Sequence, residues 1–407
     1  MQGPPVVDEL QPPNRTLMGP GPSDVHPRVL GAMNKPLLGH LDAAFLEVMD
    51  EVQELLRYVF QTSNEFTIPV SGTGSAAMES VITSLVSPGD VVLIAENGYF
   101  GDRMAEMAAR AGGEVSRISA PWGEPLDTGS AERALKQVDP DLFGFVHMET
   151  STGVLQPEVA TLTELAHEAG ALTIIDTVAS LGGVEFRTDD WDVDVVYSGA
   201  QKCLSCPPGV SPVTLSDTAR DRLLDRTDTP RSWYLDLALL AEYWGDERTY
   251  HHTAPISNVY ALRESLRIVA EEGLEQRWER HERVASGLQV GLEALGLDLA
   301  TDEAHWSPSL TTVHVPDGVD PDTVISRLLA EYGIEIAGGL GNLAGEIFRI
   351  GCMGYSARSA NVLHLISALG QLLADEGAKV DVDAGVAAAS GVLSDGSDQT
   401  HEPSVPM

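Results

Sequence analysis

The 407-residue sequence predicts an α/β fold, with a large domain built on a mainly parallel seven-stranded sheet flanked by helices and a smaller C-terminal α+β domain. From about residue 64 onward, short apolar runs alternate with longer amphipathic segments. The runs are continuously apolar, which is typical of strands buried on both faces of a parallel sheet. The length of the chain also favours two domains over one.

The seven predicted strands follow one another along the chain at residues 66–70, 91–95, 115–119, 142–147, 172–175, 193–197 and 210–215. Helices are expected between them, beginning near Gly74 after the first strand and near Phe100 after the second. Because helical crossovers join parallel strands, these helices should cover both faces of the sheet.

A long helical region over residues 256–295 is expected to lead from the sheet to a second, smaller unit. That unit has predicted strands at 310–315 and 347–351 and predicted helices at 322–332 and 357–376. We therefore divide the chain into an N-terminal arm (1–17), a large domain (18–265), a small C-terminal domain (266–378) and an acidic tail (379–407). The tail is rich in Ala, Gly, Ser and Asp, so we expect it to be disordered and uninvolved in catalysis.

The charge balance is strongly acidic, with 25 Lys and Arg against 61 Asp and Glu and a formal net charge of −36. A nucleic-acid partner is not expected, because phosphate binding calls for basic patches. Dense carboxylates keep a protein surface hydrated in concentrated salt, which screens their mutual repulsion. The composition therefore indicates a halophilic source.

Cysteine usage and hydropathy predict a cytoplasmic protein without membrane association. Cys203, Cys206 and Cys352 do not make a disulfide framework, and no secretory or transmembrane run precedes the first domain. Cys203 and Cys206 have C-x-x-C spacing, but no second pair or nearby histidine completes a zinc site. The adjacent His251 and His252 lack a third ligand at metal spacing, so no metal is expected.

An acidic residue and a lysine each follow a predicted buried strand. Asp176 ends the segment Leu-Thr-Ile-Ile-Asp, and Lys202 ends the segment Ser-Gly-Ala-Gln-Lys. A lysine amine can condense with the aldehyde of pyridoxal phosphate, and a carboxylate facing the pyridine nitrogen keeps that nitrogen protonated. The chain has only four lysines, and of these only Lys202 follows an apolar strand. The pair predicts a pyridoxal phosphate site in the large domain, with Lys202 and Asp176 as its catalytic residues.

The loop of residues 71–77 (Ser-Gly-Thr-Gly-Ser-Ala-Ala) lies between a predicted strand and a predicted helix. Its small residues let backbone N–H groups approach a phosphate at the helix N-terminus. The same glycine spacing also fits the dinucleotide fingerprint, with Glu96 placed for a ribose hydroxyl. An NAD-dependent oxidoreductase is therefore an alternative, although it leaves the lysine and aspartate pair without a role.

Arg349 lies inside the predicted apolar strand Ile-Phe-Arg-Ile-Gly. A charge is costly there unless it has an anionic partner. A planar guanidinium can hold a carboxylate by two parallel hydrogen bonds. We expect Arg349 to bind a substrate α-carboxylate, with a structural salt bridge as the alternative.

Together these motifs resemble the alanine:glyoxylate and serine:pyruvate aminotransferase family, which belongs to the class V, fold type I pyridoxal phosphate enzymes. The resemblance is carried by residues 176–183 (Asp-Thr-Val-Ala-Ser-Leu-Gly-Gly), 197–202 (Tyr-Ser-Gly-Ala-Gln-Lys), 207–209 (Pro-Pro-Gly), 250–253 (Tyr-His-His-Thr) and 347–351. It extends from about residue 18 to the predicted helix after Ser356. The motifs occur in the order that the family has, which makes the match more specific than any single motif.

The resemblance implies further cofactor-binding residues within one subunit. They are Thr73, Gly74, Ser75 and Gln201 for the phosphate, Thr150 near the hydroxyl oxygen attached to the pyridine ring, Phe100 stacked on the ring, and Val178. Many relatives carry tryptophan where this chain has Phe100, which offers less stacking area and no N–H.

The resemblance also implies a homodimer. In the family, the residues that match Tyr250 and Thr253 reach the phosphate of the neighbouring subunit. Each site would then need both subunits.

The predicted activity is a ping-pong transamination of small amino acids through a Lys202 aldimine, with alanine or serine as donor and glyoxylate or pyruvate as acceptor. Lys202 would also move the proton between the substrate and the cofactor. Arg349 serves only the α-carboxylate, so small uncharged side chains should be preferred unless Arg103 or a partner arginine supplies a second cation.

Three alternatives remain open besides the NAD-dependent oxidoreductase. Within the family, aspartate or ureidoglycine could be the donor. A cysteine desulfurase-like lyase is a second alternative, although Gln201 stands where those enzymes usually have histidine and Cys352 lies at a strand end. A cofactor-free, non-catalytic dimer is the third.

Overall fold

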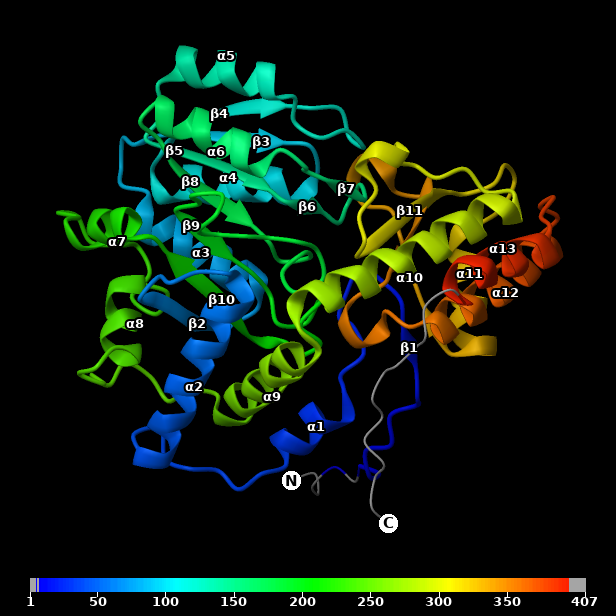
Figure 1. Ribbon diagram of the computed structural model, residues 1–407, viewed down its shortest axis with the longest axis horizontal. Helices are drawn as coiled ribbons and strands as arrows, with labels where there is room; N and C mark the ends of the chain where they lie inside the picture. The colour runs from blue at the N-terminus through cyan, green and yellow to red at the C-terminus, as the bar shows by residue number, and fades with distance from the viewer. Residues whose placement is uncertain (1–4, 6, 395–407) are drawn as a thin grey trace.

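The computed structural model describes residue 5 and residues 7–394 of the 407-residue chain. Seven strands form the main sheet: β2 (Phe66–Gly72), β3 (Val91–Glu96), β4 (Glu114–Ser119), β5 (Leu142–Val146), β8 (Leu172–Asp176), β9 (Val195–Tyr197) and β10 (Gly209–Leu215). Their spatial order is β2-β10-β9-β8-β5-β3-β4 (Figure 1). β10 runs antiparallel to both its neighbours, and the other pairs are parallel. This confirms the predicted mainly parallel seven-stranded sheet.

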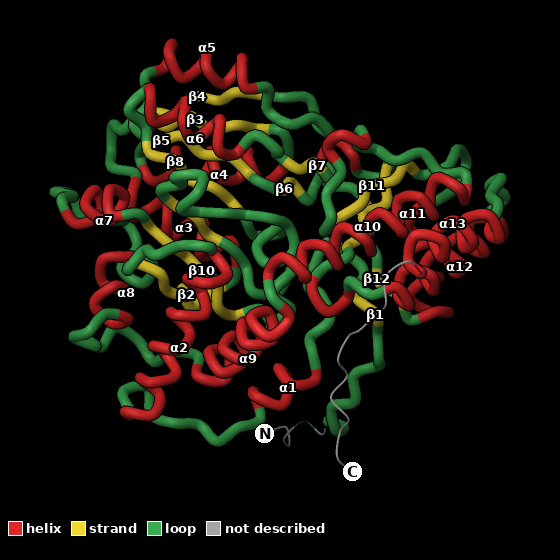
Figure 2. Tube along the Cα trace, viewed as in Figure 1, coloured by secondary structure: helices red, strands yellow, loops and turns green. Residues whose placement is uncertain are grey.

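Helices surround this sheet, as Figure 2 shows. They are α2 (Ala43–Phe60), α3 (Gly74–Leu85), α4 (Tyr99–Ala111), α5 (Thr128–Val138), α6 (Val159–Glu168), α7 (Asp217–Leu224), α8 (Leu237–Trp244) and α9 (Ile256–Glu272). The strands β5 and β9 are buried along their whole length. Their apolar side chains therefore pack against helices on both faces, which explains their lack of alternation.

A second, smaller unit follows. It contains α10 (Leu274–Leu295), β11 (Leu310–His314), α11 (Pro321–Arg327), β13 (Ala337–Gly338), β14 (Ile347–Gly351) and α12 (Ser359–Asp375). β14 pairs antiparallel with both β11 and β13. The predicted helical region over 256–295 is broken at Gly273, whose φ of 83° ends α9 and precedes α10. Glycine adopts this conformation without steric cost.

The N-terminal segment also joins the small unit. β1 (Thr16–Leu17) pairs in parallel with β12 (Ile334–Glu335). Met18 belongs to the core of the small unit, whereas the core of the large unit contains residues from Val29 to Leu274. The chain therefore passes from the small unit into the large one before it reaches the sheet.

The predicted disorder of the tail is wrong for residues 382–394. These residues form helix α13 (Val382–Ser394), which packs against α10 and α12 and buries Gly385, Ala389 and Leu393. The spacing of four residues puts these three on one helical face. The composition rich in Ala and Gly predicts disorder, but the small residues are what allow two helices to pack closely. Residues 395–407 of the predicted tail lie outside the described residues.

None of the described helices combines the length and the apolar composition that a membrane span requires.

Candidate active site

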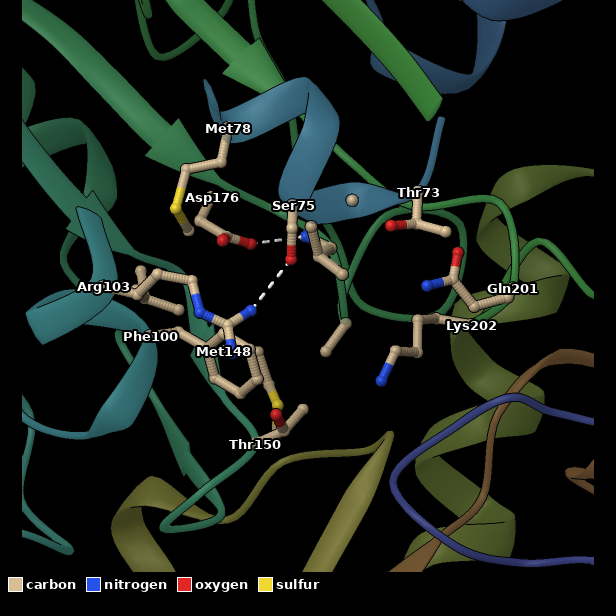
Figure 3. Close-up of a pocket in the computed structure, with 14 residues that line it drawn as sticks. Thr73, Ser75, Met78, Phe100, Arg103, Met148, Thr150, Asp176, Gln201 and Lys202 are labelled. Atoms are coloured by element: carbon tan, nitrogen blue, oxygen red, sulfur yellow. Dashed lines mark hydrogen bonds between the residues drawn. The ribbon is translucent and has the colours of Figure 1, made fainter. Parts of the chain in front are cut away.

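A pocket of about 220 Å³ lies next to the carboxyl ends of the parallel strands (Figure 3). Nine of the predicted site residues line it: Thr73, Gly74, Ser75, Phe100, Thr150, Asp176, Val178, Gln201 and Lys202. Five further residues line it, of which Arg103 was considered from the sequence as a possible second cation: Met78, Arg103, Val146, Met148 and Ala179. The tertiary structure thus brings together residues that lie up to 129 positions apart in the sequence, from Thr73 to Lys202.

The loop between β2 and α3 presents the N-terminus of α3 to the pocket. Thr73 is the N-cap residue of α3, and its side chain makes no capping hydrogen bond. The first N–H groups of the helix are therefore suited to an anion. Gly74 lies against Val178, because a Cβ at Gly74 would come within 3.0 Å of Val178 Cγ2. A larger residue at 74 would push into the floor of the pocket.

Asp176 is buried at the end of β8, where its carboxylate accepts two hydrogen bonds. One comes from the backbone N–H of Val178 at 2.7 Å, and the other from the hydroxyl of Tyr197 at 2.8 Å. Burial raises the pKa of Asp176 to about 6, while both hydrogen bonds act to lower it. The carboxylate is therefore ionised at neutral pH and is held in a fixed orientation.

Lys202 lies in the turn after β9, with its amine in the pocket. The Nζ atom donates a hydrogen bond to the carbonyl of Pro20. Burial is the main cause that lowers the pKa of Lys202 to about 8, and the charge of Arg349 acts in the same direction. More of this amine is neutral, and hence nucleophilic, near pH 8 than for an ordinary lysine.

Gly21 is a site residue that was not predicted from the sequence. It adopts a φ of +111°, and a Cβ there would lie 2.5 Å from Cδ and 2.6 Å from Nζ of Lys202. Only glycine fits beside this lysine in that conformation. The Gly-Pro-Gly-Pro run at residues 19–22 is the signal that could have indicated it.

Arg349 is 6% exposed in the middle of β14 and bonds to two backbone carbonyls. Its Nε donates to Gly338 at 2.7 Å, and its Nη1 donates to Thr150 at 3.2 Å. Among the described residues, no carboxylate forms an ion pair with Arg349, so the structural salt bridge is not observed. Two carbonyls fix the orientation of the guanidinium without neutralising its charge.

Glu149 fixes the position of Phe100. Its buried carboxylate accepts from the N–H groups of Phe100 at 3.0 Å and Gly101 at 3.4 Å, and from Ser151 N at 3.0 Å and Oγ at 2.7 Å. The N-terminus of α4 is thereby tied to the turn that carries Thr150. Thr150 was predicted as a site residue from the sequence, whereas Glu149 was not.

Tyr250 and Thr253 do not line this pocket. They lie between α8 and α9, where Tyr250 is 57% exposed. Neighbouring His252 hydrogen-bonds through Nε2 to Ser71 Oγ at 2.7 Å. Within the described part of the chain, no group of three or more His, Cys, Asp or Glu is placed to hold a metal ion.

Comparison with known proteins agrees with this geometry. The family model for class V aminotransferases matches residues 19–349. This chain belongs to the class V aminotransferase family. Like its close homologues, this aminotransferase is a fold type I enzyme that uses pyridoxal phosphate.

Several relatives of this aminotransferase have names that state an activity. It is 40% identical to (S)-ureidoglycine–glyoxylate transaminase of Bacillus subtilis, covering 94% of this chain and 96% of the relative. It is 41% identical to alanine–glyoxylate aminotransferase of Callithrix jacchus, covering 90% of each. A solved alanine–glyoxylate aminotransferase from Nostoc sp. is 51% identical with a TM-score of 0.89, covering 90% of this chain and 97% of that one.

The residues of this aminotransferase fit pyridoxal phosphate. An anion-binding helix terminus, a buried carboxylate and a lysine with a lowered pKa surround one pocket. Gln201 Oε1 is buried without a hydrogen-bond partner among the described residues, which is consistent with a polar ligand beside it.

Proposed function

We propose that this aminotransferase transfers the amino group of alanine or serine to glyoxylate or pyruvate. The observation that carries the proposal is that Lys202 and Asp176 line one small pocket, while the charge-unpaired Arg349 lies beside it and donates a hydrogen bond to the carbonyl of the lining residue Thr150. The relatives named for glyoxylate support the acceptor, and the alanine–glyoxylate aminotransferases among them support the donor.

Each residue has a distinct part in this proposal. Pyridoxal phosphate, when bound, accepts electron density from the substrate Cα. Lys202 supplies the amine that holds the cofactor and afterwards moves a proton to and from the substrate Cα. Asp176, oriented by Tyr197, keeps a proton on the pyridine nitrogen. Arg349 holds the α-carboxylate of the substrate.

The remaining pocket residues bind and enclose the cofactor. We assign its phosphate to the N-terminus of α3 with Thr73, Gly74, Ser75 and Gln201, and one face of its ring to Phe100. Val178, which touches Gly74, would cover the other face, and Thr150 would lie beside the ring. These apolar walls exclude water from the reacting atoms.

We further propose a homodimer in which Tyr250 and Thr253 complete the phosphate site of the partner subunit. Their position outside their own pocket, and the exposure of Tyr250, support this arrangement. The free and buried cysteines are compatible with the reducing cytoplasm that we expect.

Lyase chemistry of the cysteine desulfurase type is less compatible with this site. A reactive cysteine must become a thiolate. Burial raises the pKa of Cys203 to about 11 and that of Cys352 to about 12. A cysteine desulfurase from Thermococcus onnurineus is 16% identical with a TM-score of 0.69, covering 86% of this chain and 92% of that one, and shares the fold alone.

A panel of donors and acceptors tests the substrate proposal. Alanine, serine, aspartate, glutamate and (S)-ureidoglycine would be assayed against glyoxylate, pyruvate and 2-oxoglutarate in high salt. We expect alanine or serine with glyoxylate to give the highest kcat/KM. Ureidoglycine is included because of the Bacillus subtilis relative. If aspartate or ureidoglycine is the best donor, the substrate proposal is wrong while the assignment of Lys202 stands.

Borohydride reduction followed by peptide mapping tests the assignment of Lys202. We expect the reduced cofactor on Lys202 alone, and no turnover by Lys202→Ala. Lys136→Ala is the matched control, because Lys136 is an exposed lysine that pairs with Glu132 on α5. Label on another lysine would overturn the assignment.

A further inference from the structure

Arg103 lies on the same face of α4 as Phe100 and turns its guanidinium into the pocket (Figure 3). Its Cζ lies 4.8 Å from the centroid of the Phe100 ring and 5.1 Å from that of Tyr99. Its Nη1 donates a hydrogen bond of 2.9 Å to the hydroxyl of Ser75, in the first turn of α3. The helix spacing of three residues between Phe100 and Arg103 allows both to face the same site.

The charge of Arg103 is not neutralised by the protein. The chain has more than twice as many acidic as basic residues, and most of its arginines pair with carboxylates. Asp102 and Glu96 are close in sequence to Arg103, but both pair with Arg117, at 2.5 Å and 2.7 Å. Within the described part of the chain, Arg103 has no carboxylate in ion-pair distance. Such a cation, directed into a pocket, is suited to an anionic ligand.

We propose that Arg103 is a cofactor-binding residue, which holds the phosphate of pyridoxal phosphate together with Ser75. This inference rests on the proposed cofactor site. Two cationic side chains line the pocket within the described structure, Lys202 and Arg103. Lys202 is committed to the cofactor aldehyde, so Arg103 is the lining cation that can balance the phosphate. The hydrogen bond to Ser75 places it at that end of the pocket.

This role also bears on substrate choice. A dicarboxylate donor would need a second cation for its distal group, and Arg103 is the candidate that the pocket offers. If its guanidinium is bound to the phosphate, it does not serve a distal carboxylate. Preference for small uncharged side chains then follows, although the site contains a second arginine.

Cofactor binding to the protein from which pyridoxal phosphate has been removed tests the proposal. The dissociation constants of pyridoxal phosphate and of pyridoxal, which lacks the phosphate, would be measured by absorbance for wild type, Arg103→Gln and Arg103→Lys. We expect Arg103→Gln to weaken pyridoxal phosphate binding by about tenfold or more and to leave pyridoxal binding nearly unchanged. The affinity of Arg103→Lys for pyridoxal phosphate should lie between those of wild type and Arg103→Gln, because lysine keeps the charge but loses the planar contact with Phe100.

Arg110→Gln is the matched control, since Arg110 lies on the same helix but is exposed and pairs with Glu106. Thermal unfolding of each variant shows whether it is folded. Equal weakening for pyridoxal phosphate and pyridoxal, or no weakening for either, would overturn the role of Arg103. A selective loss of activity with aspartate in Arg103→Gln would overturn it in favour of a substrate role. If wild type binds no pyridoxal phosphate, the proposed site itself fails.

Discussion

Asp176 owes its ionisation behaviour to two opposed effects of its surroundings. Burial disfavours the charged carboxylate, whereas the Val178 N–H and the Tyr197 hydroxyl favour it. The result is a pKa of about 6. If Asp176 must be ionised to keep the pyridine nitrogen protonated, activity falls as the pH drops through this value.

Removing the Tyr197 hydroxyl should move this acid limb. Tyr197→Phe deletes a hydrogen bond that lowers the pKa of Asp176, so that pKa should rise by about one unit. We expect the acid limb of the kcat/KM profile to shift to higher pH by the same amount. At pH values above this limb, kcat/KM should change little. Measuring kcat/KM against pH checks this. Tyr58→Phe is the control, because the Tyr58 hydroxyl accepts a hydrogen bond from Leu274 N and neither residue lines the pocket. An acid limb that stays in place, or moves to lower pH, would contradict the role of Tyr197.

At the scale of the element, α13 shows how small residues determine helix packing. A Cβ added to Gly291 on α10 would come within 2.4 Å of Ile366 Cδ1 and 2.9 Å of Ala389 Cβ. A Cβ added to Gly287 would meet Leu393 at 2.7 Å. The glycines of α10 therefore form the surface on which α13 lies, and Leu393 fills the space above Gly287.

Truncating Leu393 should therefore destabilise the small unit. Leu393→Ala removes a buried side chain from a close-packed contact and should lower the free energy of unfolding by about 2–4 kcal/mol. Urea denaturation measures the effect. Ala387→Ser, at an exposed position of the same helix, is the control and should change the free energy of unfolding little. A loss no larger than that of the control would mean that α13 does not pack as described.

For the whole molecule, the dominant property is the net charge of −36. The Debye length grows from about 3 Å at 1 M salt to about 30 Å at 0.01 M, so carboxylates repel one another over a longer range when salt is removed. We expect the melting temperature and the activity to fall between molar and millimolar potassium chloride. Sodium chloride at the same ionic strength, which screens charge equally, should restore both. Unchanged values across this range would refute the halophilic interpretation.

The proposed dimer makes a separate prediction about mixed subunits. Consider a dimer of one Lys202→Ala subunit and one Tyr250→Ala/Thr253→Ala subunit. If Tyr250 and Thr253 serve the partner, one of its two sites combines Lys202 of the double-variant subunit with Tyr250 and Thr253 of the Lys202→Ala subunit. Each parent homodimer should have low activity, whereas the mixture, after unfolding and refolding together, should recover activity. Wild type mixed with Lys202→Ala is the reference. Absence of recovery, with mixed dimers shown by mass spectrometry, would contradict a shared site.

The sequence by itself determined the strand series and most of the pocket. Buried parallel strands have a local signature, continuous apolar runs between helices, so all seven could be located. Lys202, Asp176 and residues 73–75 follow or precede those strands, and a parallel sheet brings such positions to one edge. For that reason nine predicted residues line the same pocket.

Only the tertiary structure decided that residues 382–394 form the helix α13, that Gly21 lies beside Lys202 and that Arg103 faces the pocket. Each depends on a contact between distant segments: α13 on the glycines of α10, Gly21 on Lys202, and Arg103 on Ser75. Composition suggested disorder for α13, because small residues bury little surface by themselves and pack only where another helix offers a matching surface. The sequence near Arg103 likewise contains carboxylates enough to pair it, but in the folded chain Arg117 takes them, and the charge of Arg103 faces the pocket.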